Sequence, residues 1–119
     1  MVGGCFDAHH EKLVGPYILI AVDTDQQMSV AYVVGGGLSV GRILPVVFAV
    51  GYDERYIVAK RHPDGDRAIT QFYYLDIAKD SETGYQFKAV TGPLKEDEFS
   101  KEKARLGLPE FKTTLDYLE

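Results

Sequence analysis

The chain carries six short, apolar-rich runs in succession, separated by polar or glycine-rich turns, with no helical segment between them. Valine, isoleucine and tyrosine dominate these runs, and their side chains fit the pleated, half-buried surface of a β-sheet. Consecutive strands that are joined by short turns form antiparallel sheets. The sequence therefore predicts a mainly β (α+β) fold, built as an open meander sheet, a small sandwich or a partly closed barrel.

Two hairpins are expected among these runs. A polar turn that begins Asp23-Thr24-Asp25 separates the first two runs, and Gly51-Tyr52-Asp53-Glu54 has the usual length of a hairpin loop. The glycine-rich residues 36–43 are expected to form a flexible loop, and Gly92-Pro93 is expected to end the last strand. The six expected strands are residues 17–22, 28–34, 43–50, 55–60, 70–77 and 85–90.

A short C-terminal helix is predicted over residues 94–106. Pro93 suits the first turn, acidic residues follow it, and basic residues gather near the end, as the helix dipole favours. Gly107 is a natural C-cap and Pro109 prevents the helix from continuing. Its apolar stripe is thin, so the helix is expected to pack shallowly at the end of the sheet.

The length and charge of the chain limit its organisation and its partners. A chain of 119 residues fits one domain, which we place at residues 15–119 behind a flexible tether of residues 1–14. Its apolar runs are all far shorter than the roughly 20 residues of a membrane span. The formal net charge of -5 argues against nucleic-acid binding and is compatible with another protein as the partner.

Cys5 is the only cysteine, which excludes an internal disulfide and a multi-cysteine metal site. Val2-Gly3-Gly4-Cys5 resembles the end of a bacterial lipobox, in which the cysteine becomes the lipidated N-terminus of the mature protein. The charged and apolar regions of a signal peptide do not precede it here. A lipid anchor on Cys5 would place the protein in the cell envelope, in the periplasm or on the outer surface. Without it, the expected location is the cytoplasm.

No motif predicts a catalytic residue, a metal site or a cofactor. The glycines of residues 36–43 lack the Lys and Ser/Thr of a phosphate-binding loop. His9 and His10 are adjacent, so they cannot share a metal as a helical pair would. The paired aspartates at positions 23/25 and 64/66 lack the further ligands of a calcium loop. One enzymatic alternative stays open, a small hydrolase or ligand-binding enzyme that uses His62 with Asp64 or Asp66.

The segment from Val47 to Pro63 resembles a family of small bacterial lipoproteins of unknown function. The shared phrase comprises a Val-Phe-Ala-Val-Gly strand, a Tyr-Ile-Val-Ala-Lys strand and a His-Pro turn. The segments 69–76 and 92–94 also fit, so the resemblance covers roughly residues 17–106. It implies an envelope location and a non-enzymatic role, without supplying a mechanism.

The sequence favours an envelope-associated, non-enzymatic protein-binding module, such as an inhibitor or an immunity-type lipoprotein. A structural subunit that pairs through an exposed strand edge is a further alternative. Loops carry most binding residues, so partner contacts are expected in the loops at 23–27, 52–55 and 62–67 and in the adjoining Arg61. The expected contacts are Asp23, Asp25, Tyr52, Asp53, Arg55, Arg61, His62, Asp64 and Arg67.

Overall fold

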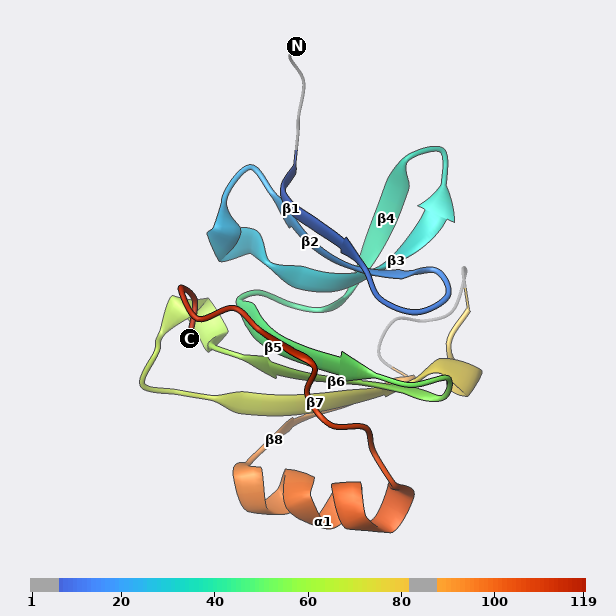
Figure 1. The fold of residues 1–119 in the computed structure, drawn as a ribbon, viewed down its shortest axis with the longest axis vertical. Helices are drawn as coiled ribbons and strands as arrows, with labels where there is room; N and C mark the ends of the chain where they lie inside the picture. Colours follow the sequence, from blue (N-terminus) through green and yellow to red (C-terminus); the bar gives the residue numbers. More distant parts are fainter. Residues whose placement is uncertain (1–6, 82–87) are drawn as a thin grey trace.

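The computed structural model describes residues 7–81 and 88–119, which form two antiparallel sheets and one α-helix (Figure 1). The first sheet contains, in spatial order, β1 (Asp7–Lys12), β2 (Tyr17–Val22), β3 (Ser29–Gly35) and β4 (Leu38–Ile43). The second contains β8 (Val90–Leu94), β7 (Gln71–Asp76), β6 (Tyr56–Arg61), β5 (Val47–Tyr52) and β9 (Thr113–Thr114). The helix is α1 (Glu96–Leu106), and the short 3-10 turns are η1 (Asp25–Gln27), η2 (Pro63–Gly65) and η3 (Ile77–Lys79). The mainly β prediction is confirmed, in its sandwich form.

Both predicted hairpins are present. β2 pairs with β3, with Tyr17 opposite Tyr32 and Leu19 opposite Val30. β5 pairs with β6, with Val50 opposite Ala59, and the Asp53 side chain closes the turn by accepting main-chain hydrogen bonds. β-branched residues supply most of these positions because their stiff side chains pack well on a pleated surface.

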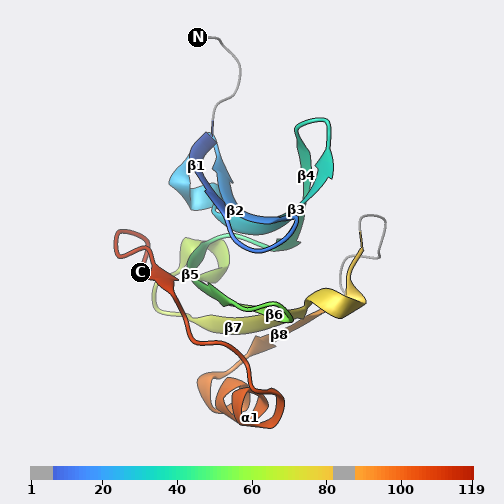
Figure 2. The same cartoon turned by 45° about the vertical axis from the view of Figure 1, so that its right-hand side comes forward.

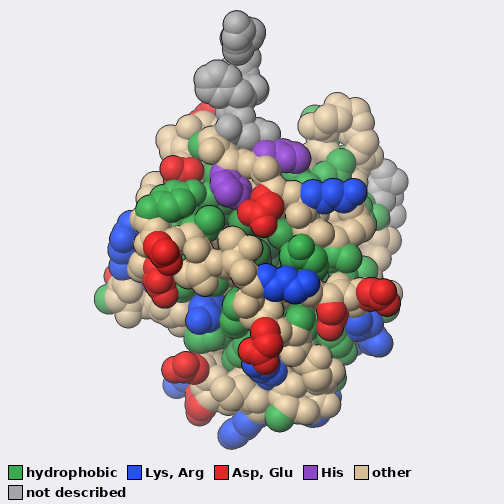
Figure 3. All heavy atoms as spheres, in the orientation of Figure 1, with side chains coloured by type: hydrophobic (Ala, Val, Ile, Leu, Met, Phe, Trp, Pro, Cys, Tyr) green, Lys and Arg blue, Asp and Glu red, His purple; other side chains and the backbone are tan. Residues whose placement is uncertain are grey.

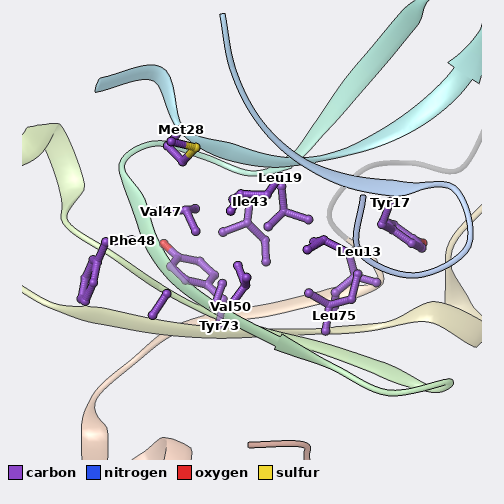
Figure 4. Close-up of a cluster of buried hydrophobic side chains, with 14 of the residues drawn as sticks. Leu13, Tyr17, Leu19, Met28, Ile43, Val47, Phe48, Val50, Tyr73 and Leu75 are labelled. Atoms are coloured by element: carbon purple, nitrogen blue, oxygen red, sulfur yellow. The ribbon is translucent and has the colours of Figure 1, made fainter. Parts of the chain in front are cut away.

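The main hydrophobic core fills the space between the two sheets. Met28, Leu19 and Ile43 come from the first sheet and the turn beside it, and they meet the inner face of β5 and β7 (Figure 4). Each fully buried side chain of this size stabilises the fold by about 1.5–3 kcal/mol. A main-chain hydrogen bond from Val47 to the Met28 oxygen, 2.9 Å long, joins the sheets directly.

The outer face of the second sheet carries a second, smaller core beneath α1. Phe99 of α1 stacks at a tilt on Phe72 of β7, with ring centroids 5.1 Å apart, and Leu108 is buried beside them. The helix ends at Gly107, whose φ of 70° is the left-handed conformation expected of a glycine C-cap. The molecule therefore has three layers, with the second sheet in the middle (Figure 2).

A buried ion pair also connects the sheets. Arg42 of β4 donates from Nε to Asp80, which follows η3, over 2.7 Å, and the two side chains are only 1% and 2% exposed. The Tyr17 hydroxyl donates to the same carboxylate oxygen over 2.7 Å. Burial, together with this hydrogen bond, raises the pKa of the Tyr17 phenol, so its hydroxyl remains a donor.

Three expectations about the strands need correction. The flexible tether predicted for residues 1–14 is wrong for residues 7–12, which form β1, because β2 supplies hydrogen-bond partners for a polar edge strand. The loop expected at 36–43 is largely strand β4, which also means that the run 43–50 is split between β4 and β5. The first half of the strand expected at 85–90 lies outside the described residues, and residues 88 and 89 are not strand. β8 starts at Val90 and runs through Gly92-Pro93, which an edge strand tolerates.

Candidate functional site

The His62 side chain is buried and lies outside the exposed turn that follows it. It is 3% exposed, and its ring stacks on Phe48 with centroids 4.2 Å apart. Nδ1 lies 2.8 Å from the Ile69 oxygen and Nε2 lies 3.1 Å from the Glu119 oxygen. Both ring nitrogens therefore face main-chain oxygens, which can only accept hydrogen bonds.

The hydrolase alternative pairs His62 with Asp64 or Asp66, and neither carboxylate is hydrogen-bonded to the His62 ring in the described residues. Asp66 is exposed and accepts a hydrogen bond from the Ala68 main-chain N–H over 3.0 Å. Asp64 is exposed within η2, where its φ is 54°. Within residues 7–81 and 88–119, neither carboxylate hydrogen-bonds to the imidazole. The geometry therefore does not assemble the acid–base pair that this alternative requires.

The predicted contact loops lie at two opposite ends of the sandwich. The loops at 23–27 and 62–67 meet at one end, where Gln26 and Gly65 line the same hollow, and the 52–55 turn lies at the other (Figure 1). Four of the expected contacts lie at the first end. Asp25 is half-buried there, and the other three, Asp23, Asp64 and Arg67, are exposed. The structure thus brings together two of the three loops.

Several of the other expected contacts are held by bonds within the chain. Arg61 donates to the Pro45 oxygen, the Gln71 side chain and the Tyr73 hydroxyl. The Lys112 ammonium lies 3.9 Å from the centre of the Tyr52 ring. Such side chains are less available to a partner than their loop positions imply. Cys5, the lipidation candidate, lies outside the described residues.

Arg55, the remaining expected contact, belongs to a group of paired charges between the second sheet and the end of α1. Its guanidinium binds Asp76 with two hydrogen bonds, of 2.8 and 3.1 Å, and this holds the pKa of that carboxyl below its usual value. Arg105 binds Glu102 in the same two-bond manner, and the Tyr74 hydroxyl adds a third donor. Together these donors lower the pKa of Glu102 to about 2. Both carboxylates are therefore satisfied within the chain.

The outer face of the first sheet offers a different kind of surface. β1 and β4 rise on either side of β2 and β3 in Figure 2, and a hollow lies on this face of the sheet. The hollow has a volume of about 490 Å³. We call it the concave face, and its lining includes the apolar Ile18, Ile20, Val22, Val33 and Leu38, with His10 at the β1 side.

The floor of the concave face is apolar and its rim is exposed. Ile18 is 6% exposed although it takes no part in the core between the sheets. Val33 and Leu38 are 37% and 67% exposed. Within the described parts of the chain, the lining comes only from this sheet and its β3–β4 turn. An exposed apolar patch on a hollowed surface is typical of a binding site for another molecule.

The sequence contains a signal for the concave face that the prediction of loop contacts missed. In a strand with one solvated face, polar and apolar residues alternate. In β2, Tyr17, Leu19 and Ala21 face the core, yet the intervening positions are the apolar Ile18, Ile20 and Val22. Apolar side chains on both faces distinguish β2 from a strand with one solvated face. By contrast, charges of both signs are interspersed over the side of the molecule in Figure 3.

The described residues contain no group of three or more His, Cys, Asp or Glu side chains placed to hold a metal. No helix among them is long and apolar enough to cross a membrane. The fold and its surfaces define a small, three-layer β-sandwich protein in which no described segment covers the outer face of the first sheet.

The chain belongs to the family DUF3997, described as a protein of unknown function, whose model matches residues 14–117. No curated protein and no solved structure matches the chain.

Proposed function

We propose that this protein is a non-enzymatic binding module that holds an amphipathic helix of a partner protein in its concave face. The observation that carries the proposal is the hollowed, apolar outer face of the first sheet, with Val33 and Leu38 exposed at its rim. Helices with one apolar face bind in hydrophobic grooves of this kind. The loop contacts expected from the sequence would then serve a secondary role or none.

The chain itself supports a helix as the occupant. The outer face of the second sheet is covered by α1, which inserts Phe99 between aromatic side chains of that sheet and of the C-terminal segment. The first sheet has an apolar outer face with no corresponding layer among the described residues. With a partner helix in the concave face, each of the two sheets would have a helix on its outer face.

Changing Val33 to glutamate is expected to abolish partner capture while leaving the fold intact. A photo-crosslinking amino acid at Leu38 would first trap the partner in native cells and identify the contacted segment. Val33→Glu should then weaken binding of the purified partner by at least about thirtyfold in calorimetry, which corresponds to about 2 kcal/mol. The reason is that the new carboxylate would lose its hydration against an apolar helix.

Ile69→Glu is the matched control, because Ile69 is 46% exposed and lies outside the concave face. It should bind the partner as the wild type does. Equal binding by both variants would contradict the proposal. A crosslinked product formed with a second copy of the chain would instead favour the structural-subunit alternative, and a partner whose enzymatic or toxic activity falls on binding would favour the inhibitor or immunity-type role.

We also propose an envelope location through a lipid on Cys5, which rests on the lipobox-like residues 2–5 and on the position of Cys5 two residues before β1. When the protein is produced from its own gene, labelled palmitate should enter the wild type and not a Cys5→Ala variant. The variant should move from the membrane fraction to the soluble fraction. An unlabelled wild-type protein, or equal labelling of both, would refute the anchor.

A further inference from the structure

A second site, independent of the concave face, lies where β6 and β7 meet the start of α1 and the last residues of the chain. Lys60, Arg67 and Lys95 contribute basic side chains to a hollow of about 420 Å³, and His62 forms part of its wall. We call this hollow the basic pocket. Glu96 and Glu119 also border it, in a chain whose net charge is -5.

The cations of the basic pocket have few partners within the chain. Within the described residues, none of the three forms an ion pair with a carboxylate, unlike Arg42, Arg55, Lys103 and Arg105. Arg67 donates one hydrogen bond, from Nη2 to the Tyr117 main-chain oxygen, over 2.8 Å. An arginine carries five N–H donors, so most of its capacity is unused.

Aromatic rings hold the Lys60 ammonium in place at the pocket. Its Nζ lies 4.7 Å from the centre of the Phe111 ring and 5.5 Å from that of Phe72. Such cation–π contacts favour a fixed position for an ammonium that would otherwise swing into solvent. The half-buried Lys60 is therefore positioned before any ligand arrives, which reduces the entropic cost of binding.

An oxygen acceptor of the chain itself already lies in the basic pocket, next to the His62 ring. The Glu119 main-chain oxygen lies 3.1 Å from Nε2, and the opposite nitrogen is fixed by the Ile69 oxygen. Stacking on Phe48 fixes the plane of the ring. An external oxygen acceptor could take the same position at Nε2.

We infer that the basic pocket binds a compact oxyanion, a carboxylate or phosphate group, between Lys60, Arg67 and Lys95, beside Nε2 of His62. The anion would replace or join the Glu119 oxygen at the imidazole. The source is either a free small anion or an acidic group on a larger molecule, and the chemistry of recognition is the same for both.

The test is an NMR titration of the full chain with inorganic phosphate and, separately, with citrate, at constant ionic strength. Saturable shifts of the His62 ring protons are expected at concentrations of about 1–10 mM, as is usual for a small anion held by a few exposed charges. Saturation by phosphate alone assigns a phosphate group, and saturation by citrate alone assigns carboxylates. Linear shifts with both anions up to about 50 mM would overturn the inference.

Variants separate a specific pocket from general charge attraction. Arg67→Gln and Lys95→Gln each change an exposed residue and should each weaken binding about two- to fivefold, with a larger loss in the double variant. Lys101→Gln removes the same charge from the exposed face of α1 and should leave the affinity unchanged. Equal weakening by Lys101→Gln would refute the pocket. The thermal midpoint of each variant shows that the fold is retained, and the concave face is untouched by all of them.

Discussion

Replacing Asp80 with alanine is expected to lower the free energy of unfolding by about 3–5 kcal/mol, the cost of leaving one member of a buried ion pair alone. The Arg42 guanidinium would then remain at 1% exposure without its carboxylate, and the Tyr17 hydroxyl would lose its acceptor. Arg42 would keep its hydrogen bonds to the Ser81 and Val40 main-chain oxygens and its cation–π contact with the Tyr32 ring. Urea unfolding followed by circular dichroism measures the change.

Two further variants test whether the cost comes from the uncompensated charge. An Arg42→Met, Asp80→Leu double variant replaces the pair by apolar side chains and should recover most of the stability lost in Asp80→Ala. Arg105→Gln removes one member of an exposed pair on α1 and should cost much less than Asp80→Ala. If Asp80→Ala costs no more than Arg105→Gln, the buried pair does not stabilise the contact between the sheets as described.

Changing Gly51 to alanine is expected to destabilise the protein by about 3 kcal/mol, at the upper end of the usual cost of overpacking. A methyl group at this position of β5 would lie 1.9 Å from the Glu110 main-chain oxygen and 2.9 Å from the Phe111 Cα. Main-chain atoms cannot rotate away as the end of a side chain can. The segment after α1 would have to move off β5, and the Lys112 N–H bond to the Val50 oxygen would be strained or lost.

Gly41 provides the matched control for Gly51. It also lies in a strand, β4, but an added Cβ would meet no atom within 4 Å. Gly41→Ala should therefore be neutral or stabilise the protein by up to about 1 kcal/mol, because alanine restricts the unfolded chain. Thermal unfolding of both variants gives the comparison. A Gly51→Ala variant as stable as Gly41→Ala would show that the C-terminal segment does not lie against β5 this closely.

The parts of the fold that the sequence predicted are those determined by local signals. Gly51-Tyr52-Asp53-Glu54 marked a hairpin by its length and its turn residues, and Gly107 marked the end of the helix by its conformational freedom. Both are found where they were expected. In these cases the residues that determine the structure are neighbours in the chain.

The strands that were missed depend on main-chain pairing with the adjacent strand and not on their own side chains. The polar residues of β1 and the glycine-rich residues of β4 carry little strand propensity of their own. Both are outer strands of the first sheet, and each is held by main-chain hydrogen bonds to an inner strand. Such bonds form whatever the side chain, so composition says little about an edge strand.

The candidate site was missed for a different reason, because it depends on contacts between residues that are distant in the chain. His62 was expected in an exposed turn, yet Phe48 and Glu119 enclose it, and neither is near it in the sequence. To predict the concave face, one must know which side of β2 the second sheet covers. That depends on how the two sheets pack. The alternating apolar residues Ile18, Ile20 and Val22 were the available sign.

The segment that follows α1 has a consequence for how the helix is retained. α1 itself buries little more than Phe99, but the next residues place Phe111 on the same aromatic cluster. Thr113 and Thr114 then pair with β5, and Leu118 enters the core between the sheets. The helix is continuous with β8 at one end and with this anchored segment at the other. It can therefore detach only if the sheet loses an outer strand, which makes helix and sheet edge one cooperative unit.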